Sequence, residues 1–202
     1  MDKKFVILLS VCFISFLAGC SSAPKVTRVE REKPIDLSGR WNDYDAQLVS
    51  QEMIGDCLKR PWLDEFYKKD GRAPRVIVGS LTNRTSEHIN VNVFTQFLER
   101  ELLNAGKVNF VASSEEREQL RGERQDQQKG LTDAETMVKL GRELGADYML
   151  VGSVNSVVDE IKGKYAILYQ VNLELIDLEN NLKVWIGQKE IKKFVEKAQY
   201  SL

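Results

Sequence analysis

The C-terminal third of the chain alternates apolar and polar positions. Between Tyr165 and Leu175, every odd-numbered residue is apolar or aromatic, and the even-numbered residues from Gln170 onward are polar. Such alternation is typical of a strand with one buried and one wetter face in an antiparallel sheet. Residues 177–181 predict a turn, in which Asn tolerates a positive φ, and residues 182–191 predict the partner strand.

Three shorter apolar runs, at residues 76–78, 108–111 and 146–151, predict further strands. The first run, Val76-Ile77-Val78, has no polar position. A continuous run of this kind fits a strand that is buried on both faces in the middle of a sheet. We therefore expect it to be a central strand.

Helical spacing of apolar residues predicts the remaining elements. One helix is expected over residues 42–60, and Pro61 starts a second one that ends near Gly71. Two other helices are expected over residues 90–104 and 114–128. A last one is expected to begin at a capping box at Thr132 and to end at Gly145. The whole pattern predicts an α+β fold, a mixed β-sheet with helices packed on it.

The first twenty residues have the three parts of a secretion signal. Lys3 and Lys4 precede a mainly apolar run, residues 5–16, which is too short to span a bilayer as a helix. Leu17-Ala18-Gly19-Cys20 then resembles a lipobox, which implies cleavage before Cys20 and a lipid on its thiol. The alternative is an ordinary secreted protein with a chance cysteine. Because no Asp follows Cys20, the sorting rule for Gram-negative lipoproteins implies the outer membrane, with the protein facing the periplasm.

These features predict four parts of the chain. Residues 1–19 are the expected signal peptide, and residues 20–40, which are charged and contain two prolines, are the expected lipid-anchored flexible tether. Residues 41–72 form an N-terminal helical segment. Residues 73–198 form the α+β domain.

Charge and cysteine content narrow the expected function. Removing residues 1–19 moves the formal net charge from −1 to −2, so nothing indicates a nucleic-acid partner. Cys57 is then the only cysteine besides the lipid-bearing Cys20, and we expect no internal disulfide. Cys57 lies on an apolar helical face, which predicts a buried thiol; the alternative is a reactive one.

No motif for catalysis stands out. The single histidine, His88, has no neighbours at metal-ligand spacing, so we expect no metal site. Gly79-Ser80 and Gly152-Ser153 lack the G-x-S-x-G context of a nucleophile elbow. A solvated helix face explains the acidic run at residues 115–118. We therefore expect no enzymatic activity, no cofactor and no small-molecule substrate.

Four pieces of sequence, in this order and spacing, resemble LpoB-type outer-membrane lipoproteins, which activate penicillin-binding proteins. They are Asn83-Arg84-Thr85, Asn104-Ala105-Gly106-Lys107, Gly145-Ala146-Asp147-Tyr148-Met149-Leu150, and Leu175-Ile176-Asp177 with Val184-Trp185. The resemblance covers Arg75–Gly187. It implies a fold similar to the N-terminal domain of TolB and to part of the curli transporter CsgG.

The resemblance also implies a role. A lipoprotein of this kind binds a bifunctional peptidoglycan synthase and favours its active state, which regulates cell-wall synthesis. Two alternatives remain: a structural or assembly lipoprotein of an outer-membrane machine, and a lipid-anchored hydrolase. The sequence departs from the best-known members in two ways, because its tether is short and the helices of residues 41–67 are additional.

Four residues are candidates for contacting the partner. Asn83, Arg84 and Thr85 either form a docking loop, or Asn83 and Thr85 satisfy a turn while Arg84 pairs with a local carboxylate. Trp185 is either a binding hot spot on the wetter strand face or is covered by the N-terminal helices. In the second case Trp41, Trp62 and Phe66 are packing residues.

Overall fold

The computed structural model describes residues 26–30, 33–127, 129 and 145–196. The chain divides into two units, residues 1–33 and 34–202. The described residues of the first unit, 26–30 and 33, form no helix or strand. The expected signal peptide, its lipobox with Cys20, and the helix expected after Thr132 lie outside the described residues.

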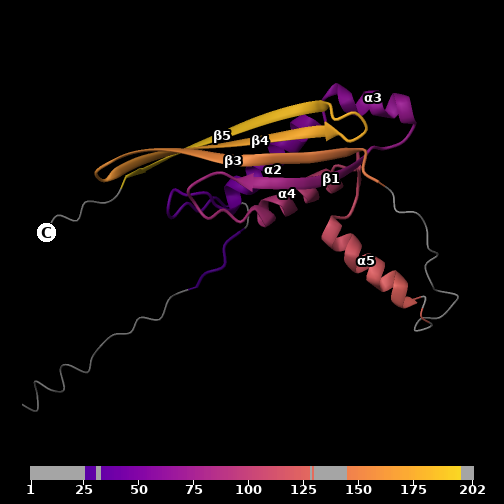
Figure 1. Cartoon of the computed structure of the whole chain (residues 1–202). Coiled ribbons are helices and arrows are strands. Elements are labelled where there is room, and N and C mark those ends of the chain that lie inside the picture. Colours follow the sequence, from indigo (N-terminus) through magenta and orange to yellow (C-terminus); the bar gives the residue numbers. More distant parts are fainter. Residues whose placement is uncertain (1–25, 31–32, 128, 130–144, 197–202) are drawn as a thin grey trace, which may run out of the picture. The chain divides into compact units, whose positions relative to one another are not determined.

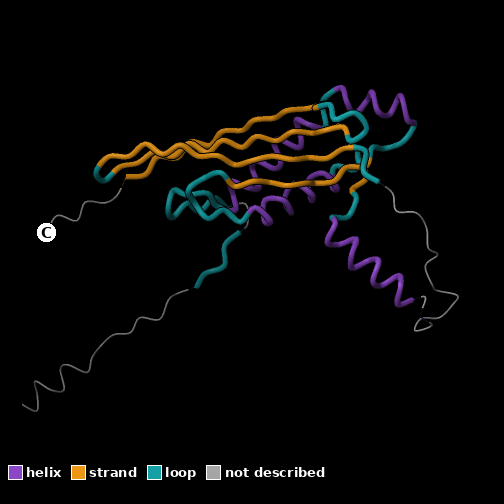
Figure 2. Tube along the Cα trace, viewed as in Figure 1, coloured by secondary structure: helices purple, strands orange, loops and turns teal. Residues whose placement is uncertain are grey.

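The second unit contains a mixed five-stranded sheet (Figure 2). Its strands are β1 (Arg75–Asn83), β2 (Asn109–Phe110), β3 (Tyr148–Ile161), β4 (Lys164–Asp177) and β5 (Lys183–Glu196). The spatial order is β2-β1-β3-β4-β5. Strand β1 runs parallel to β2 and β3, and β4 runs antiparallel to β3 and β5. The expected mixed sheet of an α+β fold is therefore confirmed.

Strands β3, β4 and β5 are longer than their apolar runs. Strand β3 was expected to end at residue 151, but it continues to Ile161 because its second half pairs with β4 residue by residue. Its pairing with β1 ends at Val154, so the far ends of β3, β4 and β5 extend beyond β1 (Figure 2). The turn at residues 162–163 places Gly163 at φ 83°. The expected positive φ in the second turn is confirmed at Asn181, with φ 63°.

Four helices are described, and local signals set their ends. They are α2 (Asp43–Cys57), α3 (Pro61–Asp70), α4 (Val91–Asn104) and α5 (Ser114–Asp126). Asn42 and Asp45 form a capping box, in which each side chain accepts a hydrogen bond from the other's backbone N–H at 3.0 Å. Pro61 occupies the first turn of α3, and Gly71 ends that helix with φ 66°.

Helices α2 and α4 pack on one face of the sheet (Figure 1). Along β1, Val76 and Val78 are buried beneath the helices, whereas Ile77 is only half-buried. The prediction that this strand is buried on both faces is therefore wrong. Successive side chains of a strand point to opposite faces, and the described helices cover only one of them.

The N-terminal helices share the core of the sheet. Trp62 and Phe66 of α3 both make edge-to-face contacts with Tyr148 of β3, at ring-centroid distances of 4.9 and 5.6 Å. Trp41 makes the same kind of contact with Phe94, at 5.9 Å. These contacts confirm that Trp41, Trp62 and Phe66 are packing residues.

Cys57, at the end of α2, lies in this core. Its side chain is buried, which confirms the interpretation as a buried thiol. Burial raises the pKa of Cys57 to about 12, so the thiol stays protonated at neutral pH and is a poor nucleophile.

Candidate functional site

The loop that follows β1, residues 84–90, contains a hydrogen-bonded turn. The Thr85 backbone N–H donates to Asn83 Oδ1 at 2.9 Å, and Asn83 Nδ2 donates to the Glu87 carbonyl at 2.7 Å. The Glu87 backbone N–H donates in turn to Thr85 Oγ1 at 3.1 Å. Asn83 and Thr85 therefore satisfy the turn, as one of the two interpretations of the sequence predicts.

Arg84 lies at the outer side of this turn. Its backbone N–H donates to the Val154 carbonyl at 2.8 Å, which fixes the residue against β3, while its side chain is exposed. The predicted pairing of Arg84 with a local carboxylate is not found among the ion pairs of the described residues. The turn thus presents a guanidinium group to solvent on a well-ordered backbone.

A buried tyrosine ties the loop to the core. The Tyr169 hydroxyl donates to Glu87 Oε1 at 2.7 Å and accepts from the Trp41 backbone N–H at 2.9 Å. Burial, and then the hydrogen bond to Glu87, raise the pKa of Tyr169 well above its ordinary value. The hydroxyl therefore keeps its proton and remains a donor. The sequence analysis missed Glu87 and Tyr169, because nothing in the sequence joins two polar groups 82 residues apart.

Trp185, the fourth candidate, lies elsewhere in the domain. Its side chain is 5% exposed, and its Nε1 donates to Asp56 Oδ2 of α2 at 2.9 Å. This confirms that the N-terminal helices cover Trp185 and leaves it almost no surface for a partner. The structure therefore brings Asn83, Arg84 and Thr85 together, without Trp185.

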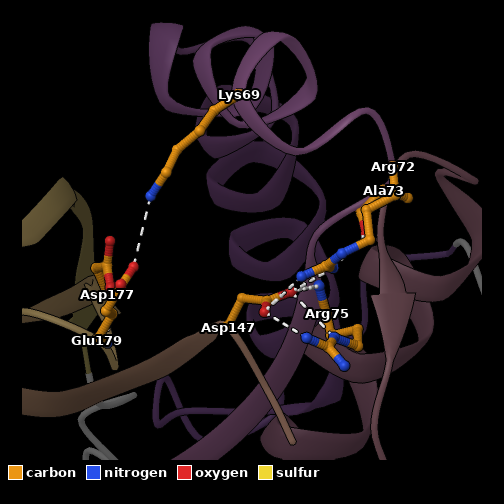
Figure 3. Close-up of polar contacts among 7 residues, drawn as sticks. All are labelled: Lys69, Arg72, Ala73, Arg75, Asp147, Asp177 and Glu179. Atoms are coloured by element: carbon orange, nitrogen blue, oxygen red, sulfur yellow. Dashed lines mark hydrogen bonds and ion pairs between the residues drawn. The ribbon is translucent and has the colours of Figure 1, made fainter. Parts of the chain in front are cut away.

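A second polar cluster joins the starts of β1 and β3 (Figure 3). Arg72 donates to both oxygens of Asp147, at 2.7 and 2.9 Å, and Arg75 donates to them at 2.7 and 3.1 Å. The Arg75 backbone N–H also donates to Asp147 Oδ2, at 2.8 Å. Burial raises the pKa of Asp147, but these hydrogen bonds outweigh burial and hold the pKa well below its ordinary value.

This cluster borders an open hollow of about 570 Å³ between α3 and the β4–β5 turn. Lys69 and Glu179 form a 3.5 Å ion pair across it (Figure 3). Asp147 belongs to a segment that the sequence analysis had singled out, but its partners Arg72 and Arg75 had not been identified. They lie more than seventy positions away in the sequence.

Neither a metal site nor a membrane-spanning helix is found among the residues that the structure describes. Within that part of the chain, no group of three or more His, Cys, Asp or Glu side chains is placed to hold a metal ion. No described helix is both long enough and apolar enough to cross a bilayer.

Comparison with known proteins identifies a family. The family described as "Peptidoglycan-synthase activator LpoB" matches residues 45–191. The match begins inside α2, so the family model includes most of the residues 41–67 that were expected to be additional relative to the best-known members. No curated protein matches the chain.

Several solved structures are similar to the chain. The LpoB C-terminal domain from Escherichia coli is 24% identical, with a TM-score of 0.36, over 68% of this chain and 94% of that domain. The corresponding domain from Salmonella enterica is 21% identical, with a TM-score of 0.33, over 65% and 93%. Lipoprotein GNA1162 from Neisseria meningitidis is 16% identical, with a TM-score of 0.38, over 63% and 88%.

Proposed function

Because the chain belongs to the LpoB family of peptidoglycan-synthase activators, we propose that it binds a bifunctional peptidoglycan synthase and favours the active state of that enzyme. The family match over residues 45–191 is the observation that carries this proposal. Activation by binding requires that the protein bind the active state more tightly than the resting one. A tenfold difference in affinity corresponds to about 1.4 kcal/mol.

The proposal includes the placement of the protein. Cleavage before Cys20 leaves a lipid on its thiol, which holds the protein at the periplasmic face of the outer membrane. The motif Leu17-Ala18-Gly19-Cys20 supports this anchor. Within the proposed tether, Ser38 already contacts the sheet, since its carbonyl accepts a hydrogen bond from the Tyr165 hydroxyl at 2.5 Å. The segment that separates the domain from the membrane is therefore Cys20–Lys33.

The contact surface that we propose is the turn formed by Asn83, Arg84 and Thr85. Arginine is one of the residue types that dominate binding energies, and this one is exposed on a turn held by the core. A rigid turn loses little conformational entropy when it binds. Asn83 and Thr85 support the turn, and Arg84 supplies the charged contact.

Replacing Arg84 tests this surface. We expect Arg84→Ala to weaken binding to the synthase about tenfold or more, because the guanidinium contact is lost. Arg84→Lys keeps the charge but loses the planar fork of donors. Its affinity for the synthase should therefore lie between that of Arg84→Ala and that of the unmodified protein. Binding of the mature protein to purified bifunctional synthases, measured by surface plasmon resonance, gives these affinities.

Lys68→Ala is the control, because Lys68 is an exposed cation on α3 that lies outside the turn. Thermal unfolding should be the same for all three variants and the unmodified protein. If Arg84→Ala binds as tightly as Lys68→Ala, the turn is not the contact surface. If the unmodified protein binds none of the synthases of its cell, the proposed function is wrong.

A further inference from the structure

Four exposed apolar side chains lie at the far end of the β3–β4–β5 hairpins, among exposed charged ones. Val157, Ile161 and Phe194 are 66%, 72% and 67% exposed, and Val158 is 45% exposed. Groups of exposed apolar side chains often mark a surface that contacts something else. We call these four residues the apolar tip.

The apolar tip covers both faces of the sheet. On the face without described helices, Phe194 pairs with Ala166, and Val157 pairs with Leu168. Val158 points to the opposite face, since successive residues of a strand alternate. Because β1 has ended by this point, no other described strand flanks β3 here. The tip is a projecting edge with apolar groups on both sides, and not a groove.

The N-terminal segment joins the domain at this same end. Asp36 forms a 2.8 Å ion pair with Lys193, the residue beside Phe194, and Gly39 lies against Val195. Between these contacts, Leu37 is 94% exposed and lines the same hollow as Val158. The chain from Cys20 to Pro34 spans at most about 46–50 Å, whatever its conformation. A lipid on Cys20 would therefore keep this end of the domain within about 50 Å of the membrane surface.

We propose that the apolar tip inserts into the surface of the membrane that holds the lipid anchor. This inference rests on the anchor of the proposed function. Side chains such as Phe194 and Ile161 gain free energy by leaving water for the boundary of the acyl chains. Lys162 and Lys192, both exposed, flank them and can place their ammonium groups among the lipid headgroups.

The attraction is mainly apolar, and the tether assists it. Asp159 and Glu160 at the tip offset Lys162 and Lys192, so the region carries little net charge. A patch of this size binds a free bilayer weakly. Tethering makes the contact intramolecular, and effective concentrations in such cases reach the millimolar range.

The loop after β1 lies near the apolar tip, because Ser86 and Glu87 line the same hollow as Val158. Insertion would therefore place the Arg84 turn on the membrane side of the domain, and the synthase would have to reach it there.

A pair of single-cysteine labels tests the inference. Phe194 and Ile186 lie on the same face of β5, and their exposed fractions are similar, at 67% and 63%. Ile186 is eight residues before Phe194 and therefore lies away from the apolar tip. Full-length lipidated Phe194→Cys and Ile186→Cys variants are labelled with a polarity-sensitive fluorophore and reconstituted in phosphatidylethanolamine–phosphatidylglycerol vesicles. Cys57 is buried and stays unlabelled. Acyl-brominated phosphatidylcholine then serves as the quencher.

We expect quenching at position 194 to exceed quenching at position 186 by about twofold or more. Adding Val157→Asn and Ile161→Asn to the Phe194→Cys variant should reduce it to the value at position 186. Equal quenching at both positions overturns the inference. So does quenching that survives the two Asn replacements, because the fluorophore itself would then be inserting. Loss of quenching when protein is diluted at constant lipid indicates a second copy of the chain, and also overturns it.

Mass spectrometry and vesicle flotation distinguish a failure of the tip insertion from a failure of the proposed lipid anchor. An acylated Cys20 with co-flotation but no difference between positions 194 and 186 overturns only the tip insertion. A product without an acyl group that does not float with vesicles overturns both.

Discussion

At the scale of single residues, Asp147 shows how one carboxylate connects distant parts of the chain. It accepts hydrogen bonds from the side chains of Arg72 and Arg75 and from the Arg75 backbone N–H (Figure 3). Charge-assisted, bidentate hydrogen bonds are stronger than neutral ones. The carboxylate therefore holds the beginning of β1 beside the beginning of β3.

This arrangement predicts a stability that depends on pH. The pKa of Asp147 is lowered in the folded state, so its contribution is complete above the ordinary carboxyl pKa and is lost as the pH falls below it. We expect Asp147→Asn to lower the free energy of unfolding at pH 7 by about 2 kcal/mol. The difference in the free energy of unfolding between Asp147→Asn and the unmodified protein should shrink toward pH 2. Urea unfolding at pH 7, 4 and 2.5 measures it.

Asp159→Asn is the control, since Asp159 is exposed and makes no ion pair among the described residues. Its free energy of unfolding should differ from that of the unmodified protein by less than about 0.5 kcal/mol at each pH. A constant deficit for Asp147→Asn at all three pH values would contradict the role of its charge.

At the scale of elements, a buried lysine joins the N-terminal segment, α2 and β5. Lys193 of β5 is 9% exposed and forms ion pairs with Asp36 at 2.8 Å and with Asp45 of α2 at 2.6 Å. It also donates to the Arg40 carbonyl at 2.9 Å. Burial lowers the pKa of Lys193, but the hydrogen bonds to both carboxylates outweigh burial and raise it. The lysine therefore stays charged over the physiological range.

We expect Lys193→Met to destabilise the domain by about 3–5 kcal/mol, because it leaves Asp45 buried without its cationic partner. The double variant Asp45→Asn with Lys193→Met should recover part of that loss, since no buried charge then lacks a partner. Denaturant unfolding of the single and double variants gives the coupling energy. Additive losses would show that the two residues contribute independently.

At the scale of the whole molecule, the length of the chain before the domain limits its reach. Residues 36–39 already contact β4 and β5, so the tether proper is the stretch from Cys20 to Lys33. In the proposed function, a synthase held in the inner membrane meets the domain across the periplasm. The proposal therefore requires that the docking domain of the synthase extend to within reach of the outer membrane, where the apolar tip would also hold this protein.

Lengthening the tether tests this limit. We expect that inserting a Gly/Ser segment of about twenty residues after Ser22, which adds up to about 66–72 Å of reach, increases synthase activation in cells when Val157→Asn and Ile161→Asn also release the apolar tip from the membrane. The unfolding temperature of the domain should not change. Cell-wall incorporation of a labelled precursor measures activation, and an insertion of three residues is the control. Unchanged or reduced activation with the long insertion would show that reach is not limiting.

The sequence by itself determined the local features of this protein. The alternation from Tyr165 to Leu175, the start of α3 at Pro61 and its stop near Gly71 depend only on neighbouring residues and backbone geometry. Their structures follow the predictions closely. The four family-like segments identified the family for the same reason, since they stay recognisable without any knowledge of their partners.

Only the tertiary structure decided which distant groups meet. The second half of β3 carries too few apolar residues to predict a strand, and it is one because β4 pairs with it. Ile77 is only half-buried because the described helices pack on the other face of β1, and Trp185 is covered because α2 lies on β5. The register of the sheet also brings together two hydrogen-bonded pairs, Glu87 with Tyr169 and Asp147 with Arg75. Such pairings depend on the free energy of the whole fold, which no short stretch of sequence contains.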